Sequence, residues 1–449
     1  MLLYKKDRID LTEGIIWKTL LMFTLPIVAG NFFQHLYTTA DAIIIGKFTG
    51  KAGLAAIDSV YSLLKLPINI FGGLSAGAAI LISQLFGAKQ GHDLFRTIHT
   101  ALGLTLIIGT ALSAIGVLAS PFLLRVMGVP DDIFTMTLTY VRIYFAGIAV
   151  SLLYNIGAGI LRALGNAKTP FYALIVSSLL NVILDLCFIG MLNGRIGGAA
   201  LATVLAQLLS AVIILCALMQ KSGACPVRIA NITIQRQAAF HIAKIGIPIG
   251  VQSALFPIAN MMIQAAINST GTENIAAWAV CGKLDFLIWI ILEAMTSAVA
   301  PFAAQNYGAK KYRRVTAGVR VAVSIAVLLI GAMSAVLYFW SIPIGKLFIN
   351  AQDYTVLAIV QRLMRIQAPF YTVFVFAEIL AAAIQGTGET VKPMLLTVLG
   401  ICLFRIIWIV VFVPFNPVID IIIAAFPLSW ILTSLLFVVY YCRYRKWFL

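Results

Sequence analysis

Long runs of apolar residues recur from one end of this 449-residue chain to the other. The run VAVSIAVLLIGAMSAVLY, residues 321–338, contains no charged residue. Because a helix needs about 20 apolar residues to cross the hydrocarbon layer of a bilayer, each run predicts a transmembrane helix. Reading between charged or turn-rich breaks predicts twelve helices, with cores near residues 18–45, 54–82, 98–119, 139–161, 169–190, 197–219, 239–266, 275–304, 315–340, 355–384, 393–413 and 419–441. The pattern therefore predicts an all-α polytopic membrane protein.

The charges agree with a membrane setting and predict its orientation. Only 11% of the residues are charged, less than half of the roughly 25% usual in soluble domains. Lys and Arg number 21 on the side of the two termini and 5 on the opposite side. The positive-inside rule therefore predicts that both termini lie in the cytoplasm, and the expected location is the cytoplasmic (inner) membrane. The net charge of +16 comes from these loops, so it does not predict nucleic-acid binding.

Three pairs of similar segments indicate that the chain is an internal duplication. They lie 221 to 223 residues apart: FTLPIVAG (23–30) with IGIPIGVQ (245–252), SQLFGAKQGHDLFR (83–96) with AQNYGAKKYRRV (304–315), and GILRALGNAKTPF (159–171) with AAIQGTGETVKPM (382–394). Six helices return the chain to its starting side, so the two halves share one orientation and are expected to be related by a pseudo-twofold axis along the membrane normal. This predicts an N-terminal six-helix lobe (1–222), a cytoplasmic linker (223–238) and a C-terminal six-helix lobe (239–449). Two like bundles facing a central cleft are typical of transporters.

No motif for a catalytic or nucleotide site is present in the sequence. The six cysteines are scattered without CxxC or Cys/His spacing, and no HExxH occurs, so neither a zinc site nor a disulfide framework is indicated. GKFTGKAG (46–53) has the wrong glycine spacing for a phosphate-binding loop and falls in a predicted external loop. An intramembrane enzyme, a channel and a seven-helix receptor fit the pattern less well than a transporter. We therefore expect a transporter without a resident cofactor that is driven by an ion gradient.

Four polar residues in the first half are the candidates for the coupling-ion site. Asp41 and Asp185 lie near the outer ends of the first and fifth predicted helices, and Thr203 lies near the outer start of the sixth. At a rise of 1.5 Å per residue, all three lie about 6–9 Å below the outer boundary. Asn181 lies one turn deeper than Asp185 on the same helix face. The cluster suits sodium, bound by hard oxygens, or a proton shared between carboxylates; a purely structural polar network is the alternative.

Other polar residues inside the predicted spans are candidates for the substrate cleft, although each alone also suits an interhelical hydrogen bond. These are Gln34, Tyr37, Asn69, Asn155, Gln207, Gln252, Asn260, Gln264, Glu293 and Glu378. Gln252, Asn260 and Gln264 follow one face of the seventh helix. Glu293 and Glu378 either attract a cationic substrate or pair with Lys283 or Arg405.

The segments LPIVAGNFFQHLYTTADAIIIGKFTG, LSAGAAILISQLFGAKQG, LRALGNAKTP and IQGTGETVKP resemble those of the MATE (multidrug and toxic compound extrusion) transporters. The resemblance extends over nearly the whole chain. It implies a V-shaped arrangement of two six-helix lobes and an antiporter that exports organic compounds, cationic or amphipathic, in exchange for protons or sodium. It also implies small-molecule substrates, a bilayer setting, a monomer and no nucleic acid.

Within that family the chain is most similar to the prokaryotic DinF-like branch. The resemblance implies that Asp41, Asn181, Asp185 and Thr203 bind the coupling ion, and that sodium, if used, binds there. The NorM-like branch uses acidic residues in helices 7 and 10; here helix 7 has none, and Glu378 in helix 10 is a partial match. Pro26 is a candidate hinge, although proline is also simply tolerated in membrane helices. Export or flipping of an endogenous lipid-linked or metabolite substrate is the alternative function.

Overall fold

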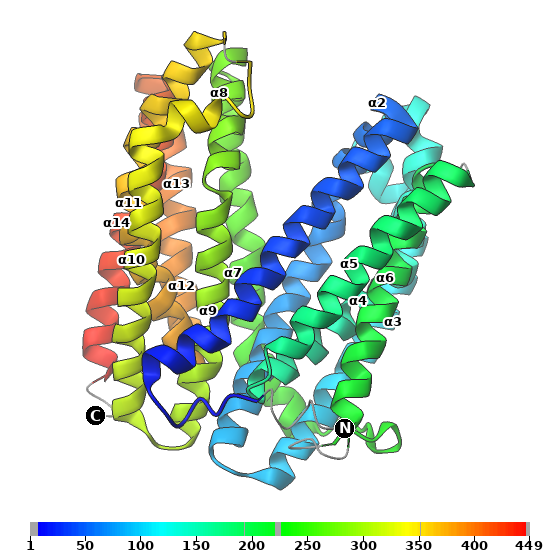
Figure 1. Ribbon diagram of the computed structural model, residues 1–449, viewed down its shortest axis with the longest axis vertical. Coiled ribbons are helices and arrows are strands. Elements are labelled where there is room, and N and C mark those ends of the chain that lie inside the picture. The colour runs from blue at the N-terminus through cyan, green and yellow to red at the C-terminus, as the bar shows by residue number, and fades with distance from the viewer. Residues whose placement is uncertain (1–7, 193, 221–225, 351, 446–449) are drawn as a thin grey trace. The chain divides into compact units, whose positions relative to one another are not determined.

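The computed structural model describes residues 8–192, 194–220, 226–350 and 352–445, and over these residues every regular element is a helix (Figure 1). Within the described ranges, twelve helices are long and apolar enough to cross a membrane. Each of them overlaps one of the twelve predicted spans, so the predicted fold class is confirmed.

The first six spans form the elements from α2 to α6. α2 (Ile16–Gly87) contains the first two spans, which meet at Gly50, where φ is +69° and glycine is favoured. The remaining elements of this half are α3 (Gly91–Val126), α4 (Asp131–Ala163), α5 (Lys168–Asp185) with its π-helical continuation η1 (Leu186–Met191), and α6 (Arg195–Met219).

The second six spans follow the short 3₁₀ turn η2 (Ile229–Asn231). They are α7 (Arg236–Asn268), α8 (Thr272–Leu284) with α9 (Phe286–Gly308), α10 (Tyr312–Gly345), α11 (Tyr354–Gly386), the composite eleventh span, and α14 (Ile419–Tyr444). The composite span runs through α12 (Val391–Thr397), η3 (Val398–Leu403), α13 (Phe404–Ile407), η4 (Trp408–Phe412) and η5 (Val413–Phe415). The sequence pattern predicts one continuous eighth span, whereas the structure interrupts it at Asp285, between α8 and α9.

The chain divides into two compact units. The N-terminal unit comprises Met1–Asp10 and Leu25–Gly250, and the C-terminal unit comprises Leu11–Thr24 and Val251–Leu449. The helical chain therefore passes from one unit to the other at Leu25 in α2 and at Val251 in α7. Residues 223–225 of the predicted linker lie outside the described residues, and the predicted domain boundaries stay a prediction.

The duplication is visible in the backbone of the two units. Lys89 and Lys310, from the matched GAK segments, both have a positive φ, of 57° and 58°. Such a conformation is uncommon for a residue with a side chain. Gly165 and Gly388, from the third matched pair, have φ values of 85° and 93°. The repeated segments therefore form the same turns in each half.

Close helix packing in the N-terminal unit depends on glycine. A Cβ atom added to Gly73 of α2 would lie 2.1 Å from the backbone nitrogen of Gly250 in α7, and one added to Gly77 would lie 2.5 Å from that of Gly246. Small residues at such positions let two membrane helices approach closely.

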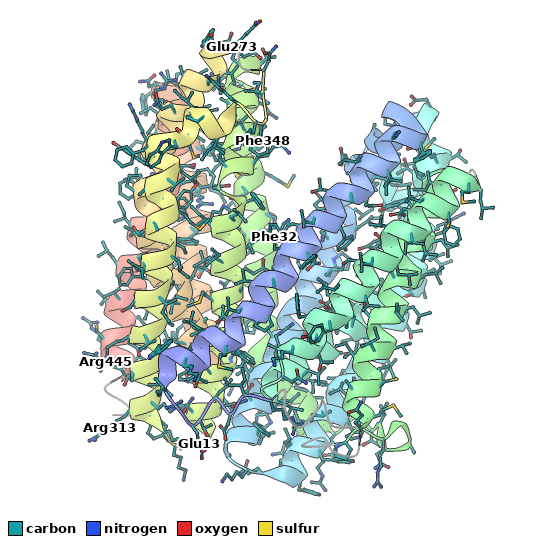
Figure 2. All side chains as sticks on the ribbon, in the orientation of Figure 1. Glu13, Phe32, Glu273, Arg313, Phe348 and Arg445 are labelled. Carbon is teal, nitrogen blue, oxygen red and sulfur yellow. The ribbon has the colours of Figure 1, made fainter. Side chains whose placement is uncertain are left out.

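Side chains at the ends of the C-terminal unit agree with the predicted alternation of loops. Figure 2 shows Arg313 and Arg445 at one end of this unit and Glu273 at the opposite end. Arg313 follows the eighth span, Arg445 follows the twelfth, and Glu273 follows the seventh. An odd number of spans therefore separates Glu273 from each arginine, as a through-membrane path requires.

Candidate functional site

Two carboxylic acids meet inside the N-terminal unit. Asp41 comes from the first span of α2, and Asp185 is the last residue of α5. Their carboxyl groups lie close enough to interact with one another. Asp185 is fully buried and Asp41 is half-buried. The structure therefore brings together two residues that lie 144 positions apart in the sequence.

The polar atoms around this acid pair are largely without protein partners. Apart from the contact between the two acids, both Asp185 carboxyl oxygens, Oδ1 of Asp41, both amide atoms of Asn181 and Oε1 of Gln207 are buried and form no hydrogen bond with the described residues. Buried polar groups in folded proteins are normally hydrogen-bonded, because leaving one unpaired costs about 1–3 kcal/mol. Six such atoms in one place indicate a site that completes its bonds with an ion or water.

A narrow cavity lies beside Asn181 and Gln207 of this cluster. Its walls include Tyr37, Asn181, Thr203 and Gln207, and its volume is about 10 Å³. That is room for about one water molecule. Thr203 donates its hydroxyl proton to the Ala199 carbonyl at 3.0 Å, which leaves its oxygen lone pairs available to a cation.

The local backbone explains how α5 presents these groups. Asn181 and Asp185 are four residues apart, so they lie on one face of the helix, and both are buried. Directly after Asp185 the chain adopts the wider π-helical geometry of η1. Single π-helical turns inside α-helices are frequent at functional sites. The arrangement supplies oxygen ligands for a hard cation, or two carboxyl groups that can share a proton.

Two tyrosines complete the surroundings of the acid pair. Tyr37 and Tyr140 are both close enough to interact electrostatically with Asp41 and Asp185. Tyr37 is among the predicted cleft residues, whereas sequence reasoning did not find Tyr140 of α4. An aromatic residue in an apolar helix gives no sign of its direction, so the sequence held no signal for it.

The other predicted residues of the N-terminal unit lie apart from this cluster. The Gln34 side chain is exposed, and that of Asn69 is half-buried outside the cavity. Asn155 donates to the Ser151 carbonyl at 2.9 Å, and its own carbonyl accepts a bond from Ser75. The Asn155 side chain therefore bonds within its own helix, and only its backbone carbonyl accepts the bond from Ser75. Pro26 lies within the first helix of α2.

The predicted residues of the C-terminal unit form three separate groups. Gln252 accepts a hydrogen bond from Gln385 at 3.3 Å. Glu293 of α9 and Glu378 of α11 lie close enough for their carboxyl groups to interact. Asn260 and Gln264 line a second cavity together with Arg405. Arg405 bonds to Asn260 and Ser429, not to Glu378.

That second cavity contains polar residues that sequence reasoning did not place in a site. Asp285 accepts bonds at Oδ2 from the Tyr371 hydroxyl at 2.7 Å and the Trp289 indole at 3.0 Å. Arg405 is 1% exposed. The available signal was a lone arginine in the apolar segment LGICLFRIIWIVV (399–411). An ionised residue inside a span faces protein or water rather than lipid.

Comparison with known proteins agrees with this architecture. The family model MatE matches residues 26–187 and 248–411, one stretch in each half. The chain is 26% identical over 395 residues to the probable multidrug resistance protein YoeA of Bacillus subtilis, covering 86% of this chain and 84% of that protein. It is 25% identical over 347 residues to an FAD transporter of Shewanella oneidensis, covering 76% of each.

A solved structure shows the same fold. The crystal structure of a MATE protein in complex with MaL6 superposes with a TM-score of 0.92 at 21% sequence identity. The match covers 98% of this chain and 99% of that one.

Proposed function

Since the chain belongs to the MatE family, whose members are membrane transporters and not enzymes, we propose that it is a secondary antiporter. It exports organic compounds, cationic or amphipathic, across the cytoplasmic membrane in exchange for protons or sodium ions. The probable multidrug resistance protein YoeA among its relatives supports multidrug efflux.

One observation carries the proposed coupling. Asp41 and Asp185 meet in the N-terminal unit, and apart from the contact between the two acids, six buried polar atoms of Asp41, Asp185, Asn181 and Gln207 have no hydrogen-bond partner among the described residues. Asp41, Asn181, Asp185 and Thr203 form the coupling-ion site. Sodium would be held by their oxygens, whereas a proton would be shared by the two carboxyl groups, because two adjacent carboxylates cannot both ionise cheaply.

The exchange of ion for substrate depends on the charge of this site, which is neutralised when the ion is bound and negative when the ion has left. The ion loads from outside and neutralises the acid pair, which rearranges the first helix and weakens substrate binding. The substrate leaves outside, the ion is discharged inside, and the restored negative charge favours new substrate. Each charge moved inward gains about 2.3 kcal/mol per 100 mV of membrane potential.

Pro26 is the proposed hinge for the rearrangement of the first helix. It lies one residue beyond Leu25, where α2 passes from the C-terminal unit to the N-terminal unit. Proline removes a backbone hydrogen bond from a helix and so weakens it locally. A bend at this position would move Asp41 relative to the beginning of the helix.

The setting follows the same reasoning. Both termini lie in the cytoplasm, as the excess of basic residues on their side supports. The protein acts as a monomer on small-molecule substrates, binds no nucleic acid and uses no cofactor other than the coupling ion.

Efflux from proteoliposomes under separately imposed gradients tests the proposal. The purified protein is expected to move a fluorescent organic cation when a proton gradient or a sodium gradient alone is applied, which also identifies the ion. The Asp41→Asn variant should insert normally and reduce gradient-driven efflux to the level of empty liposomes. The matched control is Asp58→Asn, because Asp58 is an exposed acid of the same unit. Undiminished efflux by Asp41→Asn would refute the mechanism.

Export of an endogenous metabolite or lipid-linked compound is the second candidate. The buried Arg405 of the C-terminal unit favours it, because a positive charge attracts anionic cargo rather than cations. The similarity to an FAD transporter supports the same candidate. Accumulation of an anionic compound outside cells that express the protein, and its loss with Asp41→Asn, would separate this function from drug efflux.

A further inference from the structure

The C-terminal unit contains a cavity of about 420 Å³ that the proposed ion coupling does not use. Cavities of about 300–1,000 Å³ are typical of small-molecule sites. Its walls come from α7, α8, α9, α11, α13 and α14. All of these elements belong to the same compact unit, so the cavity is a feature of that unit alone.

Among the described residues, Arg405 is the only arginine or lysine in the cavity wall, and one of its nitrogens has no hydrogen-bond partner among them. Its Nε donates to the Ser429 hydroxyl at 3.1 Å, and its Nη1 donates to Oδ1 of Asn260 at 2.8 Å. The third nitrogen, Nη2, is buried and makes no hydrogen bond. The guanidinium therefore has neutral partners at two positions and an unsatisfied donor at the third.

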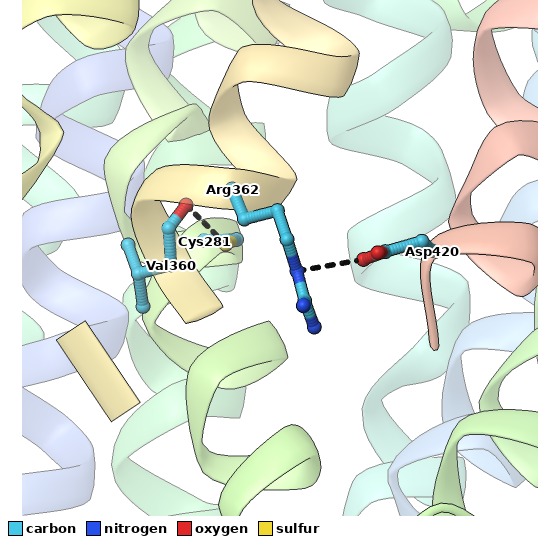
Figure 3. A network of polar contacts seen from close by, with 4 residues as sticks. All are labelled: Cys281, Val360, Arg362 and Asp420. Atoms are coloured by element: carbon cyan, nitrogen blue, oxygen red, sulfur yellow. Dashed lines mark hydrogen bonds and ion pairs between the residues drawn. The ribbon is translucent and has the colours of Figure 1, made fainter. Parts of the chain in front are cut away.

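Another arginine of the same unit, Arg362, has a carboxylate partner. Arg362 of α11 forms an ion pair with Asp420 of α14 at 3.0 Å, although its side chain is 55% exposed (Figure 3). Arg405 is far more buried, yet the described residues offer it no carboxylate partner. Because a guanidinium keeps its charge in proteins, and an unpaired buried charge is costly, an anion at Nη2 would complete the site.

Aromatic rings cover much of the remaining wall. The Arg405 guanidinium lies 4.3 Å from the ring centre of Phe426 and 5.6 Å from that of Phe256. Phe426 in turn lies 5.3 Å from Trp278 and 5.9 Å from Trp430, measured between ring centroids. Such walls favour a flat apolar body that stacks against rings.

Asp285 also lines this cavity and has the opposite charge. The alternative ligand is therefore an organic cation. Its Oδ2 already accepts two hydrogen bonds, from Tyr371 and Trp289. Arg405 instead has an unused donor. Of these two charged groups, Arg405 is the one with a buried polar atom that has no hydrogen-bond partner among the described residues, which favours an anion over a cation.

We propose that this cavity binds an organic anion with a planar aromatic body, whose acidic group accepts a hydrogen bond from Nη2 of Arg405. The inference rests on the second candidate function and deepens it, because it names the chemical class of the anion and the atom that binds it; it does not depend on ion coupling.

Equilibrium binding to the full-length protein in lipid nanodiscs tests this. Fluorescein, an aromatic dianion, and rhodamine 123, a cation, share one ring system, so they separate charge from shape. Fluorescence anisotropy, corrected with empty nanodiscs, should show fluorescein bound about tenfold or more tightly than rhodamine 123. Equal affinities, or tighter binding of rhodamine 123, would overturn the proposal.

Three variants locate the site. Arg405→Gln should weaken fluorescein binding about tenfold or more. Because that change can also disturb folding, Asn260→Asp provides a second test, in which the new carboxylate pairs with Arg405 and displaces the anion while the charge stays satisfied. Arg362→Gln is the matched control and should leave affinity unchanged, since Arg362 lies outside the cavity. Full fluorescein affinity in folded Asn260→Asp would refute the inference.

The Asp285→Asn variant is a further test of whether the cavity binds an anion or a cation. If the cavity takes anions, removal of this acid should strengthen fluorescein binding; a loss of rhodamine 123 binding with no gain for fluorescein would identify a cation site instead. No ion gradient is applied in these measurements. A failure of gradient-driven efflux with intact fluorescein binding would therefore count against the antiport, and the reverse result would count against this inference.

Discussion

The two units place polar groups on equivalent helices but satisfy them in opposite ways. In the N-terminal unit the first, fifth and sixth spans contribute Asp41, Asp185 and Gln207. In the C-terminal unit the seventh, eleventh and twelfth spans, their counterparts in the duplication, contribute Asn260, Arg405 and Ser429. The first cluster is acidic, and its atoms are largely without protein partners. The second is basic, and two of its three guanidinium nitrogens are bonded.

The carboxyl groups of Asp41 and Asp185 are therefore available to bind an ion, whereas the Arg405 guanidinium is held in place by its neighbours. Unsatisfied carboxyl oxygens can accept and release a proton or sodium without breaking protein contacts. A guanidinium bonded to two helices holds its position and presents one donor. The duplication thus produced the same helix arrangement twice, and different residues on equivalent helices made one cluster acidic and the other basic.

Replacement of Asp185 should give the largest effect and tests the first half of the comparison. Asp185→Asn is expected to reduce gradient-driven efflux to the background of empty liposomes, because the shared ion site loses a charge. Thermal stability should be retained, because apart from the contact with Asp41 neither Asp185 oxygen is hydrogen-bonded to a described residue, and an asparagine amide can still donate to Asp41. Fluorescence-detected size-exclusion chromatography after heating would measure this. A large drop in stability alongside the lost efflux would show that Asp185 is structural.

The two prolines at the unit crossings should give the next largest effect. Pro248 is the counterpart of Pro26 in the first matched pair, and it lies three residues before Val251, where α7 changes unit. The double variant Pro26→Ala/Pro248→Ala is expected to slow transport about tenfold, because straighter helices raise the free-energy barrier to bending by about 1.4 kcal/mol. Stopped-flow efflux would measure the rate.

The matched control for that pair is Pro67→Ala. Pro67 also lies within α2, but away from either crossing. An equal slowing by Pro67→Ala would show that any straightened helix impairs transport, and the hinge assignment would fall.

The sequence was sufficient to predict the fold, but it was not sufficient to predict which residues line the cavity of the C-terminal unit. Twelve spans and the duplication follow from hydropathy and repeated segments, and both are local properties of the chain. The common depth of Asp41, Asp185 and Thr203 also follows from counting residues along helices. The direction of each side chain does not, because it depends on helix rotation and on irregular geometry. Arg405 is an example: the π-helical segments η3 and η4 flank it and shift its azimuth from that of a regular helix.

A smaller effect is expected from Tyr371, which tests whether the C-terminal charges are structurally bonded. Tyr371→Phe removes the 2.7 Å hydrogen bond to Asp285 and leaves its ring contacts in place. A hydrogen bond to a charged group contributes about 1.5–3 kcal/mol, so the free energy of unfolding in detergent should fall by about 2 kcal/mol. Tyr338→Phe serves as the control, because no hydrogen bond from the Tyr338 hydroxyl is seen within the described part of the chain. Equal changes in both variants would contradict the assigned bond.

The smallest effect is expected from the ion pair between Arg362 and Asp420, the exposed counterpart of buried Arg405. Solvent screens this pair, since the side chains are 55% and 34% exposed, and such pairs contribute about 0.2–1 kcal/mol. Arg362→Gln should therefore lower the free energy of unfolding by no more than that, as measured by a double-mutant cycle with Asp420→Asn. The coupling should weaken further in high salt, because screening acts on exposed charges. A coupling energy of several kcal/mol would mean that this pair is desolvated in the membrane, and the contrast drawn with Arg405 would lose its basis.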